Sequence, residues 1–140
     1  MVVTSLLYFV TWLHGGTPCL EQCLSSVMPK APPMSTVLQF TGAERISISS
    51  RAYGGSTGKY FMFYTPAADM LMKLRRRHAP TDKPPDRLTV RHGPAFRKFT
   101  GVKSKLKASE NYTAAMGNAL AEAFYARCSL LTAAVHNRLV

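Results

Sequence analysis

Cationic side chains are the residues of this chain whose number and spacing best indicate a chemical task. Twelve of the eighteen Lys and Arg lie between Lys73 and Lys107, a segment that we call the basic limb. Only Asp82 and Asp86 oppose them, so the limb carries +10 of the formal net charge of +11. Charge gathered in this way indicates an acidic partner, such as nucleic acid, anionic lipid or an acidic protein face. The residues that we predict to contact nucleic acid are Lys73, Arg75, Arg76, Arg77, Arg87, Arg91, Arg97, Lys98, Lys103, Lys105 and Lys107.

Cysteine and histidine are too scattered to predict a metal centre. Cys19 and Cys23 are four residues apart, whereas Cys128 has no Cys or His at metal-ligand spacing. Three cysteines do not make a disulfide framework, so a reducing, intracellular compartment is the expectation. A redox role for Cys19 and Cys23 stays open, and we predict no metal and no cofactor.

The segment Gly54–Lys59 (GGSTGK) resembles a phosphate-binding loop but lacks two of its required residues. Tyr53 stands where the first Gly of such a loop should be, and Tyr60 stands where Ser or Thr should bind magnesium. A plain hairpin turn is favoured over a backbone nest that holds a phosphate. The seven acids are scattered and no nucleophile–base arrangement is visible, so we predict that the protein is not an enzyme.

The middle of the chain predicts a three-stranded meander. The expected strands are residues 36–40, 45–49 and 59–64, with Ile46 and Ile48 on the inward face. The aromatic residues of the third strand favour a core on both faces over stacking on nucleic-acid bases. Thr65 and Pro66 predict the start of a short helix that ends among basic residues.

Two further elements follow in the second half of the chain. Residues 87–91 predict a fourth strand, within a segment that has no acid between Asp86 and Glu110. We expect residues 87–107 to be ordered only with a partner, because such a composition folds poorly alone. Residues 110–137 contain no proline and are rich in alanine, which predicts one long helix with Leu120 on its apolar stripe.

The first 28 residues carry a single charge, Glu21. The apolar run at residues 2–13 is shorter than the roughly twenty residues that cross a bilayer, and it lacks the features of a targeting signal. We expect a short strand or helix, a turn at residues 15–18, a second short helix at residues 19–27 and an extended spacer at Pro29–Pro33. Core, partner-docking surface and membrane-surface anchor remain open for the apolar run.

These expectations combine into an α+β fold. It has a small antiparallel sheet of three to four strands, a short basic-ended helix, an extended basic arm at residues 79–108 and a long C-terminal helix packed on the sheet. Residues 1–33 are expected to form a docking segment and spacer, and residues 34–140 a single domain.

Three functions fit this composition. The first is a structural, RNA-contacting subunit of a large ribonucleoprotein, such as a lineage-specific ribosomal protein in the mitochondrion, with ribosomal RNA and neighbouring protein subunits as partners. The second is a non-catalytic accessory subunit of a mitochondrial membrane respiratory complex. The third is a single-stranded nucleic-acid-binding protein.

Overall fold

The computed structural model describes residues 2–23, 26–56, 59–75, 89–93, 96–100 and 112–139, with the backbone alone described in residues 89–93, 96–100 and 131–139. In chain order, the elements are α1 (Val2–Leu13), β1 (Leu20–Cys23), the 3₁₀ helix η1 (Met28–Lys30), α2 (Met34–Phe40), β2 (Glu44–Ser49), the 3₁₀ helix η2 (Ser50–Tyr53), β3 (Tyr60–Thr65), α3 (Ala68–Met72), β4 (Thr89–Gly93), β5 (Phe96–Thr100) and α5 (Ala114–Leu139).

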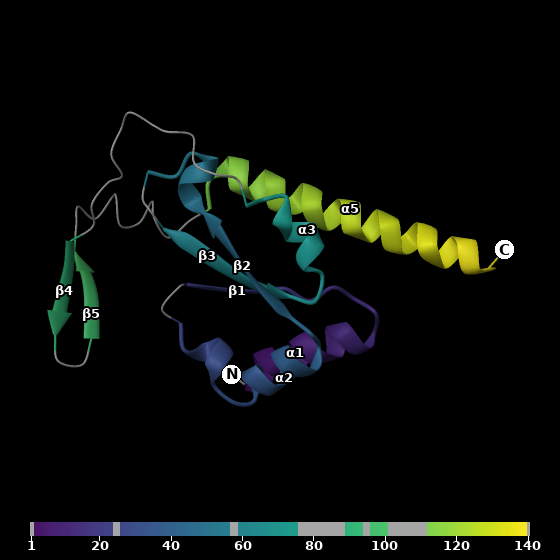
Figure 1. Ribbon diagram of the computed structural model, residues 1–140, viewed down its shortest axis with the longest axis horizontal. Coiled ribbons are helices and arrows are strands. Elements are labelled where there is room, and N and C mark those ends of the chain that lie inside the picture. The colour runs from purple at the N-terminus through teal and green to yellow at the C-terminus, as the bar shows by residue number, and fades with distance from the viewer. Residues whose placement is uncertain are drawn as a thin grey trace.

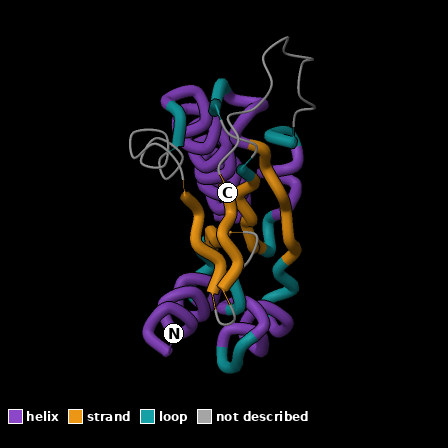
Figure 2. The backbone as a smooth tube through the Cα atoms, turned by 90° about the vertical axis from the view of Figure 1, so that its left-hand side faces the viewer, coloured by secondary structure: helices purple, strands orange, loops and turns teal. Residues whose placement is uncertain are grey.

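A three-stranded antiparallel sheet lies at the centre of the fold, in the order β1-β3-β2. Helices α3 and α5 cover one face, and α1 and α2 lie on the other (Figure 1). The tube view in Figure 2 shows the same arrangement, with the strands between the two groups of helices. The predicted α+β class, the small antiparallel sheet and the C-terminal helix packed on it are therefore confirmed.

The face beneath α3 and α5 holds the larger core. Ile46 and Ile48 of β2 and Phe61 and Phe63 of β3 alternate along their strands, so all four point to this face. The register places Ile46 opposite Phe63 and Ile48 opposite Phe61. Leu71 of α3 packs on them and is fully buried. Each such side chain contributes about 1.5–3 kcal/mol through burial of apolar surface.

The opposite face holds a smaller cluster made of Tyr8, Leu20, Met34 and Leu38. Met62 of β3 is also buried, although it points to the face opposite Phe61 and Phe63, so the central strand has buried side chains on both faces. The expectation that the aromatic strand packs on both faces is confirmed. Because Tyr8 and Leu20 share this cluster with Met34 and Leu38, the first 33 residues and those after them are packed together.

Helix α5 is fixed at its start by one side chain. The Thr113 hydroxyl accepts a hydrogen bond from the Met116 amide at 3.2 Å and donates one to the Tyr53 carbonyl oxygen at 2.6 Å. The first contact is an N-cap, and the second joins the helix to η2. Met116 is buried, and Leu120 is half-buried against the core. The predicted long helix is confirmed, with its first turn at Ala114.

Two predicted elements have the wrong type. Residues 36–40 belong to helix α2, because Met34 and Leu38 are one turn apart and both enter the cluster around Tyr8. Residues 20–23 form strand β1 in place of a helix, because the edge of β3 offers backbone partners along this stretch. In both segments tertiary contacts override local propensity.

Two predicted boundaries also change. The spacer at Pro29–Pro33 is not extended throughout, since η1 occupies residues 28–30 and Pro29 fits the first position of a helical turn. Helix α3 begins at Ala68 and not at Pro66. Thr65 still belongs to β3, and its hydroxyl accepts the Ala67 amide at 3.2 Å, which makes a turn before the helix.

Candidate functional site

The basic limb leaves the folded body at the end of α3. Lys73 and Arg75 are exposed there, whereas Leu74 between them is buried. The hydroxyl of Tyr53 donates a hydrogen bond to the Leu74 carbonyl oxygen at 2.9 Å, which fixes this end of α3 against η2. The first two cations of the limb are therefore presented from an ordered position.

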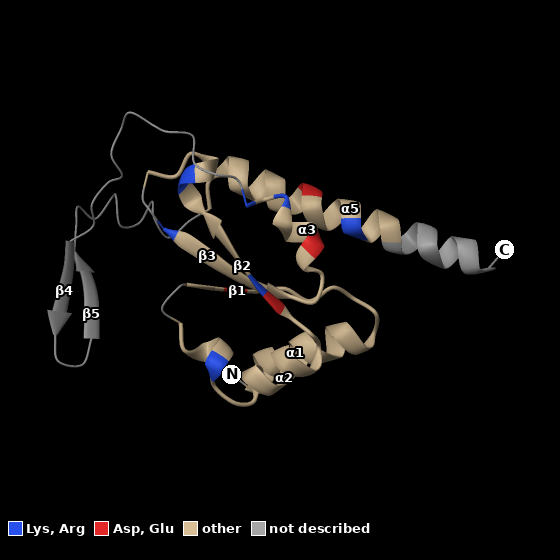
Figure 3. Ribbon diagram, in the orientation of Figure 1, with Lys and Arg blue, Asp and Glu red and all other residues tan. Residues whose placement is uncertain are grey.

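Two further cations, Arg51 of η2 and Lys59 just before β3, lie at the same end of the molecule. Arg51 belongs to η2, and the amide of the preceding Ser50 donates to the Lys59 carbonyl oxygen at 2.9 Å. The Lys59 ammonium lies 4.6 Å from the centre of the Phe61 ring, a cation–π contact. We call Arg51, Lys59, Lys73 and Arg75 the cationic end (Figure 3).

The electrostatic field of this end is not cancelled by acids along the same strands. Glu44 begins β2 and pairs with Thr65, at the opposite end of the sheet from Lys59. Charges separated by more than a Debye length of about 8 Å are largely screened at physiological salt. The cationic end therefore attracts anions with little opposition from the sheet. Arg51 and Lys59 were not among the predicted contact residues, although their place beside the expected hairpin turn was visible in the sequence.

The strands β4 and β5 form a hairpin within the limb. The predicted fourth strand is present as β4, although its first two predicted residues, 87 and 88, lie outside the described residues. It pairs with β5, a strand that the sequence did not reveal. The register sets Arg91 opposite Lys98 and His92 opposite Arg97. Like charges placed directly opposite one another destabilise a strand pair. An anion bound between them would remove that cost.

Several predicted contact residues cannot be placed. Arg91, Arg97 and Lys98 have a backbone position in the hairpin. The remaining six lie outside the described residues: Arg76, Arg77, Arg87, Lys103, Lys105 and Lys107. The structure therefore brings Lys73 and Arg75 to the same end as Arg51 and Lys59. In the hairpin, the strand register sets Arg91 opposite Lys98.

A second candidate surface lies on α1. Tyr8 is buried, and its hydroxyl donates to the Tyr64 carbonyl oxygen at 3.2 Å. Ser5, one turn earlier, is buried beside the sheet. The residues that point outward are apolar, and most are more than half exposed. We call them the α1 apolar face: Val2, Val3, Leu6, Leu7, Val10 and Leu13.

This orientation is unusual for a helix on a soluble core, where apolar side chains normally face inward. Phe40 of α2 continues the surface and is 65% exposed. Its ring packs edge-on to Phe9 and Trp12, with centroids 5.7 and 5.6 Å away. Contiguous exposed apolar surface of this kind marks a contact with another molecule.

The three thiols differ in exposure: Cys19 is half-buried, whereas Cys23 and Cys128 are exposed. None of Cys19, Cys23 and Cys128 forms a disulfide. Burial, together with a smaller effect of the nearby Glu21 carboxylate, raises the pKa of the Cys19 thiol to about 12, so this thiol stays protonated at neutral pH. Within the described ranges no three metal-ligating side chains come together, and no helix there is long and apolar enough to cross a bilayer.

Comparison with protein-family models, curated proteins and solved structures found no match to this chain. Its function is therefore inferred from the two surfaces alone.

Proposed function

We propose that this protein is a structural, RNA-contacting subunit of a large ribonucleoprotein assembly. The basic limb and the cationic end would contact the phosphate backbone of RNA, and the α1 apolar face would meet a neighbouring protein subunit. In this proposal the protein has no catalytic task. A lineage-specific ribosomal protein of the mitochondrion is the particular assembly member that we propose, with ribosomal RNA as its nucleic acid.

The observation that carries this proposal is that the β4–β5 hairpin places two cationic residues directly opposite each other on neighbouring strands. An isolated two-stranded hairpin is at best marginally stable in water. This one also sets Arg91 against Lys98, and no third strand of the described chain joins it. Such a hairpin gains stability when phosphates lie along it, because each phosphate interacts favourably with two cations and screens their repulsion.

The cationic end supports the same interpretation. Its backbone is already ordered, so binding would cost the rotamer entropy of its side chains but no ordering of the backbone. Arginine also suits phosphate, because its planar guanidinium donates two parallel hydrogen bonds. The positions of Arg51 and Arg75 beside the start of the limb would extend a single RNA track from the sheet onto the hairpin.

The test is the salt dependence of RNA binding by the whole chain. Each phosphate neutralised lowers log K against log[salt] by about 0.7 to 0.9. If six or so cations of the limb engage RNA, the slope is about −4 to −5. Fluorescence anisotropy with a labelled structured RNA would measure it. A slope near zero, or no binding at low salt, contradicts the proposal.

A charge-reversal variant makes the same test specific to the limb. We expect Arg75→Glu, Arg76→Glu and Arg77→Glu together to leave the protein folded but to abolish RNA binding and assembly. The matched control is Lys30→Glu with Arg45→Glu, two exposed cations outside the limb, which we expect to change binding little. Normal assembly of the triple variant would show that the arginines are only a solvated surface.

The α1 apolar face favours a second candidate, a non-catalytic accessory subunit of a mitochondrial membrane respiratory complex. Under this alternative the face lies against lipid or an apolar subunit, and the limb meets lipid headgroups or acidic subunits. Co-sedimentation with anionic vesicles in place of RNA binding would favour it. Binding to short unstructured RNA alone would favour the third function, a single-stranded nucleic-acid-binding protein.

A further inference from the structure

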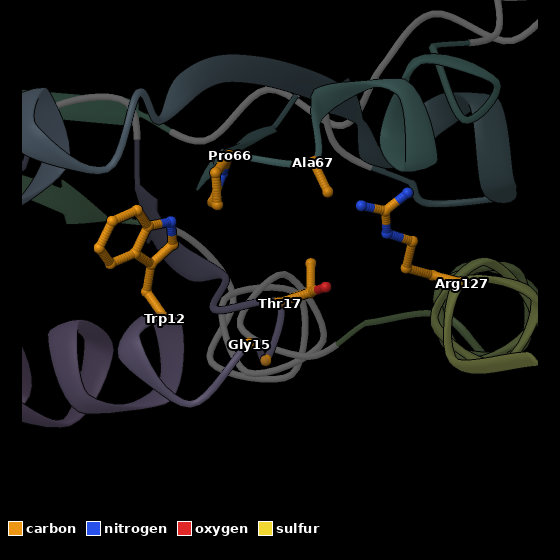
Figure 4. A pocket seen from close by; sticks show the side chains of 7 residues that line it. Trp12, Gly15, Thr17, Pro66, Ala67 and Arg127 are labelled. Carbon is orange, nitrogen blue, oxygen red and sulfur yellow. The ribbon is translucent and has the colours of Figure 1, made fainter. Parts of the chain in front are cut away.

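A pocket of about 200 Å³ lies where the loop after α1, the turn before α3 and the middle of α5 meet. Figure 4 shows the side chains that line it, with Trp12 on one side and the guanidinium group of Arg127 on the other. The pocket adjoins Pro66 and Ala67, which follow the last residue of β3. Lys59 and the cationic end adjoin the first residue of that strand. The two sites are therefore at opposite ends of β3.

One wall of the pocket is backbone held by a helix C-cap. The Gly16 amide donates to the Thr11 carbonyl oxygen at 2.9 Å, and the Gly15 amide donates to the Trp12 carbonyl oxygen at 3.0 Å. This pair of bonds is the Schellman motif, with Gly15 in the left-handed conformation at φ 73°. A Cβ on Gly16 would lie 2.8 Å from the Thr11 carbonyl oxygen. The loop is thus held in a defined shape beside Trp12.

Arg127 reaches the pocket from the C-terminal helix. Ala123 and Phe124, on the preceding turn, pack against the core and set the direction of this part of α5. The Nε atom of Arg127 is buried and has no hydrogen-bond partner in the described part of the chain. A buried donor without a partner costs about 1–3 kcal/mol, and more for a charged group. The guanidinium keeps its charge at every physiological pH, so it cannot relieve this cost by losing a proton.

The polar groups around the pocket are hydrogen-bond donors. Besides the guanidinium, they are the Thr17 hydroxyl and the indole nitrogen of Trp12, which faces the pocket in Figure 4. Among the described residues no carboxylate lines it, and the rest of the lining there is Gly, Pro and Ala. Donors around one fixed positive charge favour an anion. A volume of about 200 Å³ is below the roughly 300–1,000 Å³ of pockets that enclose whole drug-sized ligands. The occupant is therefore small, or only its anionic part enters.

We propose that this pocket binds a phosphate group, with Arg127 as its principal ligand and Thr17 and Trp12 as further donors. The three donors approach from different sides, which suits the tetrahedral oxygens of phosphate better than the two coplanar oxygens of a carboxylate. The phosphate could belong to a small phosphorylated molecule or to a nucleic-acid backbone. The inference needs no cation of the basic limb, so it holds or fails separately from the RNA proposal.

The experiment uses Trp12, the single tryptophan of the chain, as a reporter inside the pocket. Its fluorescence is followed while the full-length protein is titrated with inorganic phosphate, with a mononucleotide or with a short RNA. We expect a saturable change with phosphate, and Arg127→Gln should weaken binding at least about tenfold, because a charge-assisted hydrogen bond is lost. Arg127→Lys keeps the charge but loses the planar fork, so it should fall between the two.

The matched control is Arg75→Gln, an exposed arginine at the cationic end, which should leave the phosphate titration unchanged. If Arg127→Gln does not fold, as judged by thermal melting, Thr17→Val decides, and it should weaken phosphate binding about threefold or more. Because RNA is also expected to bind the basic limb, only the part of binding that Arg127→Gln removes is compared. A larger such part for the mononucleotide identifies a small phosphorylated ligand, and a larger one for RNA identifies a backbone phosphate. The proposal is overturned by an unchanged Trp12 signal at millimolar phosphate, by equal titrations of wild type and Arg127→Gln, or by acetate binding as tightly as phosphate.

Discussion

The three-stranded sheet and the β4–β5 hairpin are both antiparallel, and both contain an apolar cross-strand pair (Val90 with Phe99 in the hairpin), but among the described strands only the hairpin also pairs two cations. In the sheet, Ile46 faces Phe63 and Ile48 faces Phe61, and helices cover both faces. In the hairpin, Arg91 faces Lys98. The same backbone geometry therefore supports a self-sufficient core in one region and an electrostatically strained pair in the other.

The difference teaches where the free energy of each region originates. The sheet is stabilised by apolar surface that its own helices remove from water, so it needs no partner. The hairpin has too few strands to form a core and adds repulsion between like charges. A polyanion bound along the hairpin would offset that repulsion, which is why we propose that it binds one.

The largest expected effect comes from placing a charge in the sheet's core. Leu71 is fully buried on the α3 side, so Leu71→Asp would bury a carboxylate without a partner at a cost of several kcal/mol. A domain has only about 5–15 kcal/mol of stability, so we expect this variant to be largely unfolded by thermal melting. The control is Met72→Asp, the next residue along, which is 50% exposed and should melt close to the wild type. Equal melting of both variants would mean that the core is not where we place it.

A smaller effect on the free energy of unfolding is expected when pH rises, and it should come from Cys19 beside the sheet. Burial raises the pKa of Cys19 to about 12, whereas an unfolded cysteine ionises near pH 8.5. Above that pH the unfolded chain releases the proton and the folded chain keeps it, so stability falls as pH rises from about 8.5 towards 12. The loss at pH about 9.5 is on the order of 1 kcal/mol. Urea unfolding should show it in the wild type and show less of it in Cys19→Ala.

The smallest effect tests the hairpin itself. Arg91→Glu would set opposite charges across the strands, which is worth about 0.2–1 kcal/mol. In the RNA-free protein we expect amide exchange across residues 89–93 and 96–100 to slow by up to about fivefold. The same change should weaken RNA binding, because it removes a cation and adds an anion.

Slower amide exchange together with weaker RNA binding is the result expected of a hairpin that RNA stabilises. A hairpin that does not bind RNA would not show the second effect. Lys30→Glu makes the same charge change on an exposed residue away from the limb, and it should alter neither measurement. Strong amide protection of the hairpin in the wild-type, RNA-free protein would contradict the view that residues 87–107 become ordered only with a partner.

Much of the fold could be predicted because its signals are local. Alternation of Ile46 and Ile48 identifies β2, the aromatic run identifies β3, and the alanine-rich, proline-free stretch identifies α5. The basic limb can be recognised from the sequence, because counting charges along the chain needs no knowledge of tertiary contacts. The pairing partner of β4, which is β5, was missed because its two Phe residues are three apart, so no apolar alternation with a period of two marks the strand.

The candidate phosphate pocket could not be predicted, since its donors come from two segments more than a hundred residues apart in the chain. Arg127 looked like one polar residue in a long apolar helix, and Trp12 like part of an apolar run. An arginine in the middle of an alanine-rich helix, three residues after the core-packed Phe124, is the one signal that could have drawn attention to it. Only the folded chain brings it near Thr17 and Trp12.

The sequence by itself determined the class of fold, the two main strands, the long helix and the location of the positive charge. These depend on composition and periodicity, which act over a few neighbouring residues. The tertiary structure alone decided that residues 34–40 are a helix, that residues 20–23 are a strand and that α1 turns its apolar side chains outward. Each of these outcomes depends on which distant surface is available for pairing or burial. For α1 it is the Tyr8 hydroxyl, donating to the Tyr64 carbonyl oxygen, that points one side of the helix to the sheet and leaves the other for a partner.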